Sequence, residues 1–177
     1  MSVISLFISL FFVWMFGLSA YHKFANMKHY SNLMTSYGMH SPALATAAVI
    51  ILSVTELSAV ILLCMAVTRD IGLLLIILIL MIYATAMSVQ LISGHKRLQC
   101  GCAGPSSEAE ISSVLVFRNI TLAALAFLSI VIPEELPSQS FQALCFSITA
   151  SIFMVLVYLC VQQVITNSQK LIRLKNI

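Results

Sequence analysis

Five apolar runs, each long enough to cross a lipid bilayer, are the feature that most constrains how this chain can fold. A membrane-spanning helix needs about 20 predominantly apolar residues, and this chain of 177 residues is 60% hydrophobic and only 8% charged. The runs cover residues 3–21, 43–67, 71–92, 113–132 and 141–165. Because a lone strand in lipid would leave its backbone hydrogen-bonding groups unsatisfied, each run is expected to form a helix.

These runs predict an all-α, polytopic membrane helix bundle that forms a single membrane domain over residues 1–177. No stretch between the runs is polar enough to make a separate soluble domain. No basic patch of the kind that binds nucleic acid is present in the sequence. We therefore expect the surface of the bundle to contact the lipid bilayer, in a multi-pass protein of the cell membrane.

The basic residues predict how the bundle is oriented. With five spans, the loop after the first span, the loop after the third span and the C-terminal tail all lie on one side of the membrane. Arg69 lies on the opposite side, and the basic residues on the first side are Lys23, Lys28, Lys96, Arg97, Lys170, Arg173 and Lys175. The positive-inside rule makes that first side cytoplasmic.

The loop after the third span carries the sequence QCGCAG, in which one glycine separates Cys100 from Cys102. A disulfide between cysteines so close together strains the small ring that it closes, and strained, exposed disulfides are the more oxidising ones. Neighbouring positive charge on Lys96 and Arg97, together with His95, favours the thiolate that attacks disulfides. The pair is therefore a candidate redox dithiol, and the simpler alternative is two incidental loop cysteines.

A metal site is a second interpretation of the same loop, because thiolate and imidazole ligands together suit zinc or copper. All four histidines fall on the side of the cysteine loop: His22, His29, His40 and His95. Their spacing follows no regular ligand pattern, so the sequence assigns no metal.

Two charged residues inside the spans need explaining, since charge in a membrane interior requires a partner or a purpose. Arg118 lies in the first turns of the fourth span, and Glu56 in the second span is its predicted ion-pair partner. Such a pair either fixes helix register or supports chemistry, and Arg118 alone could extend to the headgroups instead. Asn119 and Tyr83 add polar groups at similar depths.

Three further cysteines lie inside the apolar runs, where a cysteine usually behaves as a small hydrophobe. Cys64 and Cys145 are interpreted in this way. Cys160 lies near the loop-side end of the fifth span, so it is also a candidate third exchanging thiol.

The loop and its surroundings resemble the MauE family of methylamine-utilisation membrane proteins, which is related to the DoxX-like group. The resemblance covers about residues 5–130. It rests on Lys23 with Phe24, on YGM and SPALA before the second span, on Glu56, on VTRDIG, on GHKRLQ leading into Cys-Gly-Cys, and on Arg118 with Asn119. Ala103 departs from the family pattern, in which an aromatic residue usually follows the second cysteine.

The resemblance implies a DoxX-like four-helix core followed by a fifth, C-terminal transmembrane helix. It also implies disulfide formation or transfer during maturation of exported proteins, alongside a thioredoxin-like partner of the MauD or TlpA type. Cys100 and Cys102 would then be the catalytic pair of a thiol-disulfide oxidoreductase. The residues expected to support them are Lys23, Glu56, Tyr83, His95, Arg118 and Asn119.

Three questions stay open at this point. A lipid-soluble quinone is a candidate second redox partner, although no motif specifies one. A metal-binding or transport protein using His22 and His95, and a non-catalytic assembly factor, are the rival functions. Exported clients would be reached most directly from the outer face, whereas the charge rule places Cys100 and Cys102 inside.

Overall fold

The computed structural model describes residues 3–94, 111–132 and 141–175, and helices make up almost all of that part of the chain. The helices follow in the order α1 (Val3–Ala25), α2 (Met27–Ser36), α3 (Pro42–Cys64), α4 (Arg69–Ile92), α5 (Ser113–Val131) and α6 (Phe141–Lys175). All of them except α2 are long and apolar enough to cross a membrane. The predicted all-α, polytopic membrane bundle is confirmed.

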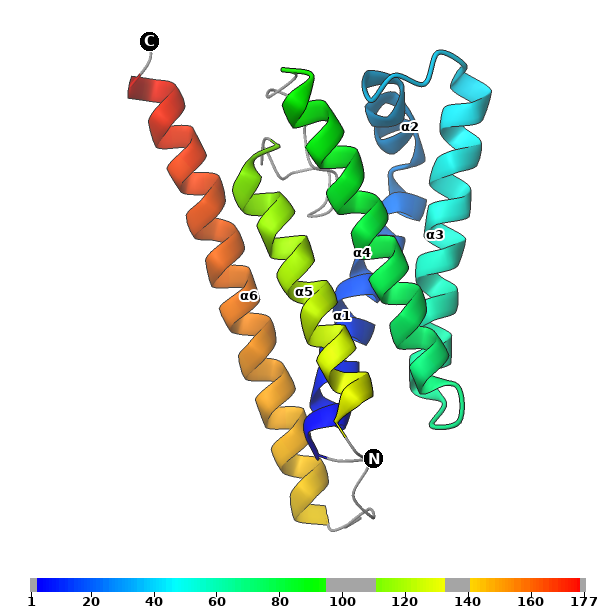
Figure 1. The fold of residues 1–177 in the computed structure, drawn as a ribbon, viewed down its shortest axis with the longest axis vertical. Coiled ribbons are helices and arrows are strands. Elements are labelled where there is room, and N and C mark those ends of the chain that lie inside the picture. The colour runs from blue at the N-terminus through cyan, green and yellow to red at the C-terminus, as the bar shows by residue number, and fades with distance from the viewer. Residues whose placement is uncertain (1–2, 95–110, 133–140, 176–177) are drawn as a thin grey trace.

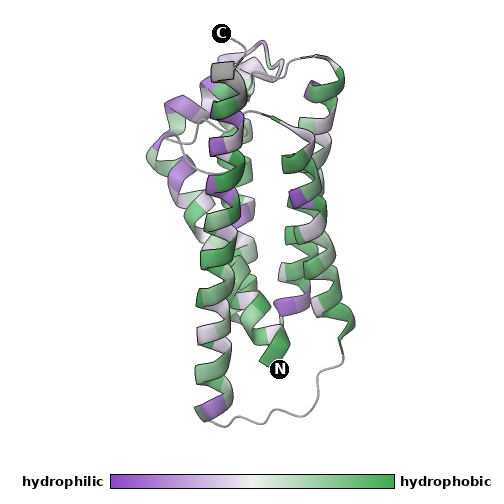
Figure 2. Ribbon diagram, turned by 90° about the vertical axis from the view of Figure 1, so that its left-hand side faces the viewer, coloured by the Kyte–Doolittle hydropathy of each residue, from purple (hydrophilic) through white to green (hydrophobic). Residues whose placement is uncertain are grey.

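The long helices lie side by side, with α4 between α3 and α5, and with α1 in contact with α3, α5 and α6 (Figure 1). A short turn joins α3 to α4 at the lower end in Figure 1, and the two helices are farther apart at the upper end, where α2 packs against α3. Hydrophilic positions gather toward the end of the bundle that carries the C-terminus (Figure 2). The more hydrophilic parts of the helices therefore lie together at one end of the bundle.

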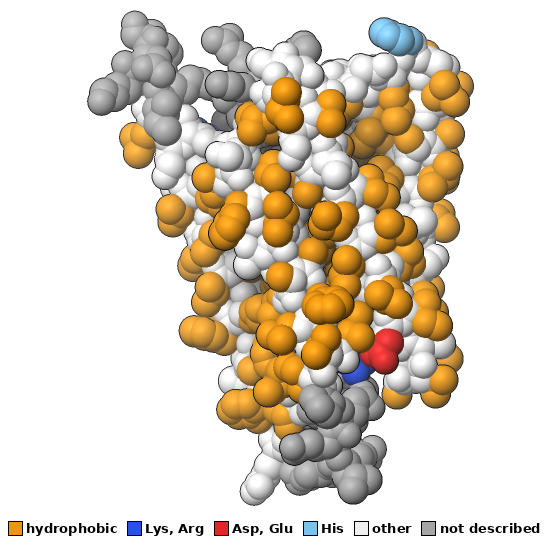
Figure 3. All heavy atoms as spheres, viewed as in Figure 1, with side chains coloured by type: hydrophobic (Ala, Val, Ile, Leu, Met, Phe, Trp, Pro, Cys, Tyr) orange, Lys and Arg blue, Asp and Glu red, His pale blue; other side chains and the backbone are white. Residues whose placement is uncertain are grey.

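Aromatic side chains of α1 lie at the centre of the buried core. Phe11, Phe12 and Phe16 are fully buried and belong to one cluster with Leu73 and Ile76 of α4. Many other apolar side chains point outward, and they are distributed along the length of the face seen in Figure 3. An apolar outer surface over helices of this length is what contact with lipid requires.

Helix α2 differs from the sequence-based expectation, which left residues 22–42 as a loop between spans. Its apolar side packs on α3, with Tyr30 and Leu33 buried in a cluster that includes Val49. Ser31 and Thr46 share a hydrogen bond of 2.9 Å between their hydroxyl oxygens, which also ties α2 to α3. The helix was missed because it is too short to cross a membrane and only one of its sides is apolar.

Glycine and proline shape the connection from α2 to α3. Gly38 has a φ of +103°, and its N–H donates to the Thr35 carbonyl at 3.0 Å while the Met39 N–H donates to the Met34 carbonyl at 3.3 Å. This pair of bonds is a Schellman motif, which favours glycine at its left-handed position. Pro42 then occupies the first position of α3, where its missing N–H costs nothing.

Helix α6 is longer than the predicted fifth span, which ended at residue 165. The helix continues to Lys175, because polar residues past the apolar run can stay helical outside the lipid. It packs mainly along α1, where Ser147 donates a hydrogen bond of 3.3 Å to the Val3 carbonyl.

Arg69 joins α4 to α5 at the end of the bundle opposite α2. Its side chain is 2% exposed, and Nη2 donates to the Ser129 carbonyl at 2.7 Å and to the Ser129 hydroxyl at 3.0 Å. A cation at the C-terminal end of α5 is also stabilised by the helix dipole. Arg69, which the sequence analysis used to predict orientation, therefore also holds α4 and α5 together.

Gly72 allows α4 to approach α3 closely. A Cβ atom at this position would lie 3.1 Å from the Leu63 backbone nitrogen and 3.2 Å from the Ala59 carbonyl oxygen. Backbone atoms cannot rotate away from such a contact, so any side chain at residue 72 must push the two helices apart.

We predict that Gly72→Ala lowers the stability of the bundle relative to Gly17→Ala, the matched control. Gly17 also lies within a helix, but a Cβ there meets nothing within 4 Å. Alanine gains about 1 kcal/mol of helix propensity at either position, while overpacking at residue 72 costs about 1–3 kcal/mol. Thermal unfolding of both variants in detergent, followed by circular dichroism, measures the difference. Equal gains in stability would show that the α3–α4 contact is not tight.

Candidate functional site

A network of polar side chains joins α1, α3 and α4 inside the bundle. The Lys23 Nζ donates to Glu56 Oε1 at 2.7 Å and to Oε2 at 2.8 Å, and it donates to the Ser19 hydroxyl at 2.7 Å. Ser19 in turn donates to Glu56 Oε1 at 3.2 Å. The Tyr83 hydroxyl also donates to Glu56 Oε1. The Glu56 carboxylate of α3 therefore accepts hydrogen bonds from two other helices, α1 and α4.

Both side chains of the Lys23–Glu56 pair are buried inside the protein, with exposed fractions of 4% and 0%. An ammonium group has three donors, and Ser19 with the two carboxylate oxygens accepts all of them. The Lys23 Nζ also lies 5.5 Å from the centre of the Tyr83 ring and 5.9 Å from that of Tyr30. The charges are thus paired and surrounded by aromatic rings, as buried charges within a membrane need to be.

The predicted pairing of Glu56 with Arg118 is wrong, because Lys23 occupies the carboxylate. Arg118 points instead to α6, where its Nη1 donates to Gln162 Oε1. Its guanidinium carbon lies 5.8 Å from the centre of the Tyr158 ring. The Arg118 Nη2 makes a long contact of 3.5 Å with Asn119 Oδ1. Gln162, Tyr158 and Asn119 are thus neutral partners of Arg118.

Although Arg118 and Glu56 do not pair, their surroundings meet at one small cavity of about 30 Å³. Ser19 and Tyr83 of the ion-pair network line it, together with Arg118 and Asn119 of α5 and Tyr158 of α6. Asn119 is 2% exposed, and its Nδ2 has no hydrogen-bond acceptor among the described residues. The structure thus brings three of the residues selected from the sequence, Tyr83, Arg118 and Asn119, around a common space.

Sequence analysis missed three of these contacts. Ser19 lies four residues before Lys23, so the two share one side of α1. Tyr158 and Gln162 have the same spacing on α6, and both contact Arg118. The signal that would have found them is a pair of polar residues four apart within an apolar run.

The remaining candidates fall in two groups. Cys100, Cys102 and His95 lie outside the described residues. Cys160 is exposed on α6, two residues after Tyr158, which puts it on the opposite side of the helix from the residue that contacts Arg118. Within residues 3–94, 111–132 and 141–175, no three His, Cys, Asp or Glu side chains come together as metal ligands.

Comparison with known proteins gives one match. Residues 1–132 match the family model described as methylamine utilisation protein MauE. The matched region contains the ion-pair network, the Cys-Gly-Cys sequence, Arg118 and Asn119, and it ends before α6. No curated protein and no solved structure matches the chain.

We predict that breaking the Lys23–Glu56 pair destabilises the bundle more than removing it. Lys23→Met or Glu56→Gln alone leaves an unmatched buried charge and should cost about 3–5 kcal/mol. The double variant leaves neither charge and should lose much less than the sum. Unfolding in detergent gives the double-mutant cycle, and Asp70→Asn, at a carboxylate that is 66% exposed, is the control expected to change little. Additive losses would rule out a coupled pair.

Proposed function

Because the chain belongs to the MauE family of methylamine utilisation proteins, we propose that this multi-pass membrane protein performs thiol–disulfide exchange through Cys100 and Cys102. Its partner is a thioredoxin-like protein of the MauD or TlpA type, and its role is in the maturation of other proteins. The observation that carries the proposal is a Cys-Gly-Cys sequence in the segment between α4 and α5, two helices whose side chains Tyr83, Arg118 and Asn119 line a common small cavity.

The proposed reaction is an exchange of two electrons and two protons. A thiolate of the partner attacks one sulfur of the Cys100–Cys102 disulfide, which breaks that bond and forms a mixed disulfide between the proteins. The partner's second thiolate attacks the mixed disulfide and releases the Cys100–Cys102 dithiol, leaving the partner oxidised. The strain expected in so small a disulfide ring favours this direction, in which Cys100 and Cys102 act as the oxidant.

The supporting residues act through charge and position. The Arg118 guanidinium, on the helix that follows the cysteine segment, supplies positive charge that favours thiolate as a leaving group. The described side chains that contact it, Gln162 and Tyr158, are neutral. The Lys23–Glu56–Tyr83 network fixes α1, α3 and α4 relative to one another and makes Tyr83 a rigid wall of the same cavity. We assign Lys23, Glu56 and Tyr83 as positioning residues.

Trapping the exchange partner tests the proposal. Cys100→Ser and Cys102→Ser each leave one thiol without a resolving neighbour, so one of these variants should accumulate a mixed disulfide with the thioredoxin-like protein. The complex should appear on a non-reducing gel, disappear with reductant and be absent in the double variant. Cys160→Ser is the control, because its exposed side of α6 faces away from Arg118, and it should exchange normally.

The rival functions give different outcomes in the same strains. Normal maturation of client proteins in the Cys100→Ser, Cys102→Ser double variant would favour a non-catalytic assembly factor. Loss of function in His22→Ala with no change in thiol state would favour a metal site, because the redox function does not use His22.

The positive-inside rule predicts that Cys100 and Cys102 face the cytoplasm. In a variant that keeps only these two cysteines, a membrane-impermeant maleimide should label the protein in permeabilised cells and not in intact ones. Prior reduction should increase the labelling if the pair rests as a disulfide. Labelling of intact cells only after reduction would place the disulfide outside, where it can exchange directly with an exported partner.

A further inference from the structure

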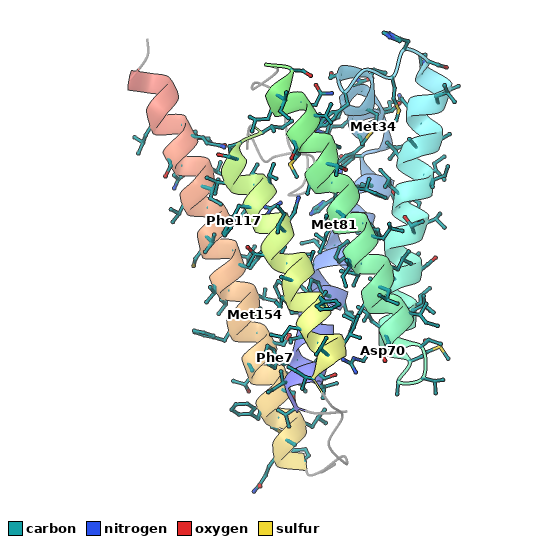
Figure 4. The ribbon with its side chains drawn as sticks, in the orientation of Figure 1. Phe7, Met34, Asp70, Met81, Phe117 and Met154 are labelled. Atoms are coloured by element: carbon teal, nitrogen blue, oxygen red, sulfur yellow. The ribbon has the colours of Figure 1, made fainter. Side chains whose placement is uncertain are left out.

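A second, larger cavity of about 440 Å³ lies between α2, α3 and α4, on the other side of the ion-pair network. It occupies the space where α3 and α4 separate beneath α2, close to Met34, which is labelled in Figure 4 and is one of its lining residues. Tyr83 lines this cavity as well as the small one beside Arg118. The two cavities are therefore adjacent, with Tyr83 between them.

The larger cavity can be reached from the lipid. Its lining includes Ile82 and Val89 of α4, which are 45% and 59% exposed on the outside of a membrane-spanning helix. The opposite wall is formed by Ala48 and Leu52 of α3, another helix long enough to cross the membrane. A molecule dissolved in the bilayer can thus enter sideways between α3 and α4.

The charges on the wall indicate a neutral ligand. Lys23 lines the cavity, but all three of its donors are taken by Glu56 and Ser19. The pair carries no net charge, so it offers no attraction for the phosphate or carboxylate of a lipid headgroup. The cavity therefore suits an uncharged lipophilic molecule rather than an anionic lipid.

The polar and aromatic groups indicate a ring with oxygen substituents. Gln90 and Tyr83 are two turns apart on α4, about 10 Å by the helical rise. One amide N–H of Gln90 donates to the Tyr37 carbonyl at 3.0 Å, and an amide nitrogen has a second N–H to offer. The Tyr83 hydroxyl gives its proton to Glu56, so Gln90 is the donor that faces a ligand here. The rings of Tyr30, Tyr37 and Tyr83 surround the space and favour stacking with a planar ligand.

We propose that this cavity binds the headgroup of a lipid-soluble quinone, with the apolar tail leaving between α3 and α4. The Gln90 amide donates to a quinone carbonyl, and the Tyr83 ring packs against the quinone ring. The methionines Met34, Met39 and Met87 adapt the wall to the ring substituents. Quinone binding extends the proposed function. Only one step rests on that function, the transfer of electrons from the Cys100–Cys102 dithiol to the quinone.

That electron transfer balances with the quinone as oxidant. Two thiols lose two electrons and two protons as the sulfur–sulfur bond forms. The quinone gains two electrons and two protons, and both of its carbonyls become hydroxyls. The disulfide is thereby regenerated for the next exchange with the thioredoxin-like partner.

Binding is tested with the full chain purified in detergent and with decylubiquinone, a short-tailed quinone, as the probe. Ala48→Trp fills the cavity from α3 and should raise the Kd at least tenfold. Ala47→Trp is the matched control, because the neighbouring Ala47 is exposed and does not line the cavity, and its Kd should stay within twofold. Gln90→Leu removes the donor with little change of volume and should weaken binding severalfold even if Ala48→Trp fails to fold.

Three results would overturn the quinone site: no saturable binding, equal binding by the Ala47→Trp and Ala48→Trp proteins when both are folded, or displacement by equimolar oleyl alcohol, which would indicate an acyl-chain site. The Cys100→Ser, Cys102→Ser double variant should bind the quinone as tightly as the unaltered chain. Anaerobic mixing of reduced protein with decylubiquinone should consume one quinone for each disulfide formed.

These measurements separate the two proposals. Saturable quinone binding that leaves the thiols reduced would overturn the electron-transfer step and the proposed redox cycle, with the binding site retained. A trapped thioredoxin-like partner without saturable quinone binding would overturn the quinone site and leave the exchange function in place.

Discussion

The ion pair between Lys23 and Glu56 is the constraint on which the arrangement of the bundle depends. A charge placed among apolar helices is expensive unless its partner is in contact, and this pair brings its groups to 2.7 Å with neither side chain more than 4% exposed. Helix α1 therefore cannot slide or rotate against α3 without separating opposite charges in an apolar interior. The same carboxylate also accepts a hydrogen bond from Tyr83 of α4. The Glu56 side chain therefore fixes the relative depths of α1, α3 and α4.

The network also divides the interior into two spaces of different character. Toward α5 lies the small cavity with Arg118 and Asn119, and toward α2 lies the large apolar cavity that Gln90 also lines. Tyr83 belongs to both. In the proposed redox cycle, Arg118 and the quinone site therefore lie on either side of Tyr83. A polar network at the boundary is satisfied within the protein, so it does not draw water into the lipid-facing cavity.

The sequence was sufficient to predict the five membrane-spanning helices but not helix α2 or the contacts between the helices. Apolar length identified the five spans because the bilayer imposes that length, and intramembrane charge identified Glu56 and Arg118. The pairing failed because the first span was ended at Tyr21, which placed Lys23 at the membrane surface. In the structure α1 continues to Ala25, so Lys23 lies on a helical side that faces α3 and reaches the carboxylate first. Helix α2 escaped notice for a related reason, since a length criterion for lipid cannot detect a short helix that packs on protein.

Helix α6 adds a contact that the matched family region does not contain. That region ends at residue 132, yet Arg118 donates to Gln162 and stacks against Tyr158, both on α6. Gln169 extends the same connection by donating to the Ser112 hydroxyl at 3.2 Å, just before α5 begins. Because α6 packs mainly along α1, these polar contacts tie it to α5 as well. The fifth span therefore contributes two of the groups that hold the Arg118 side chain. In the proposed function, α6 thereby helps to position the residue that we assign as a support for the thiolate chemistry.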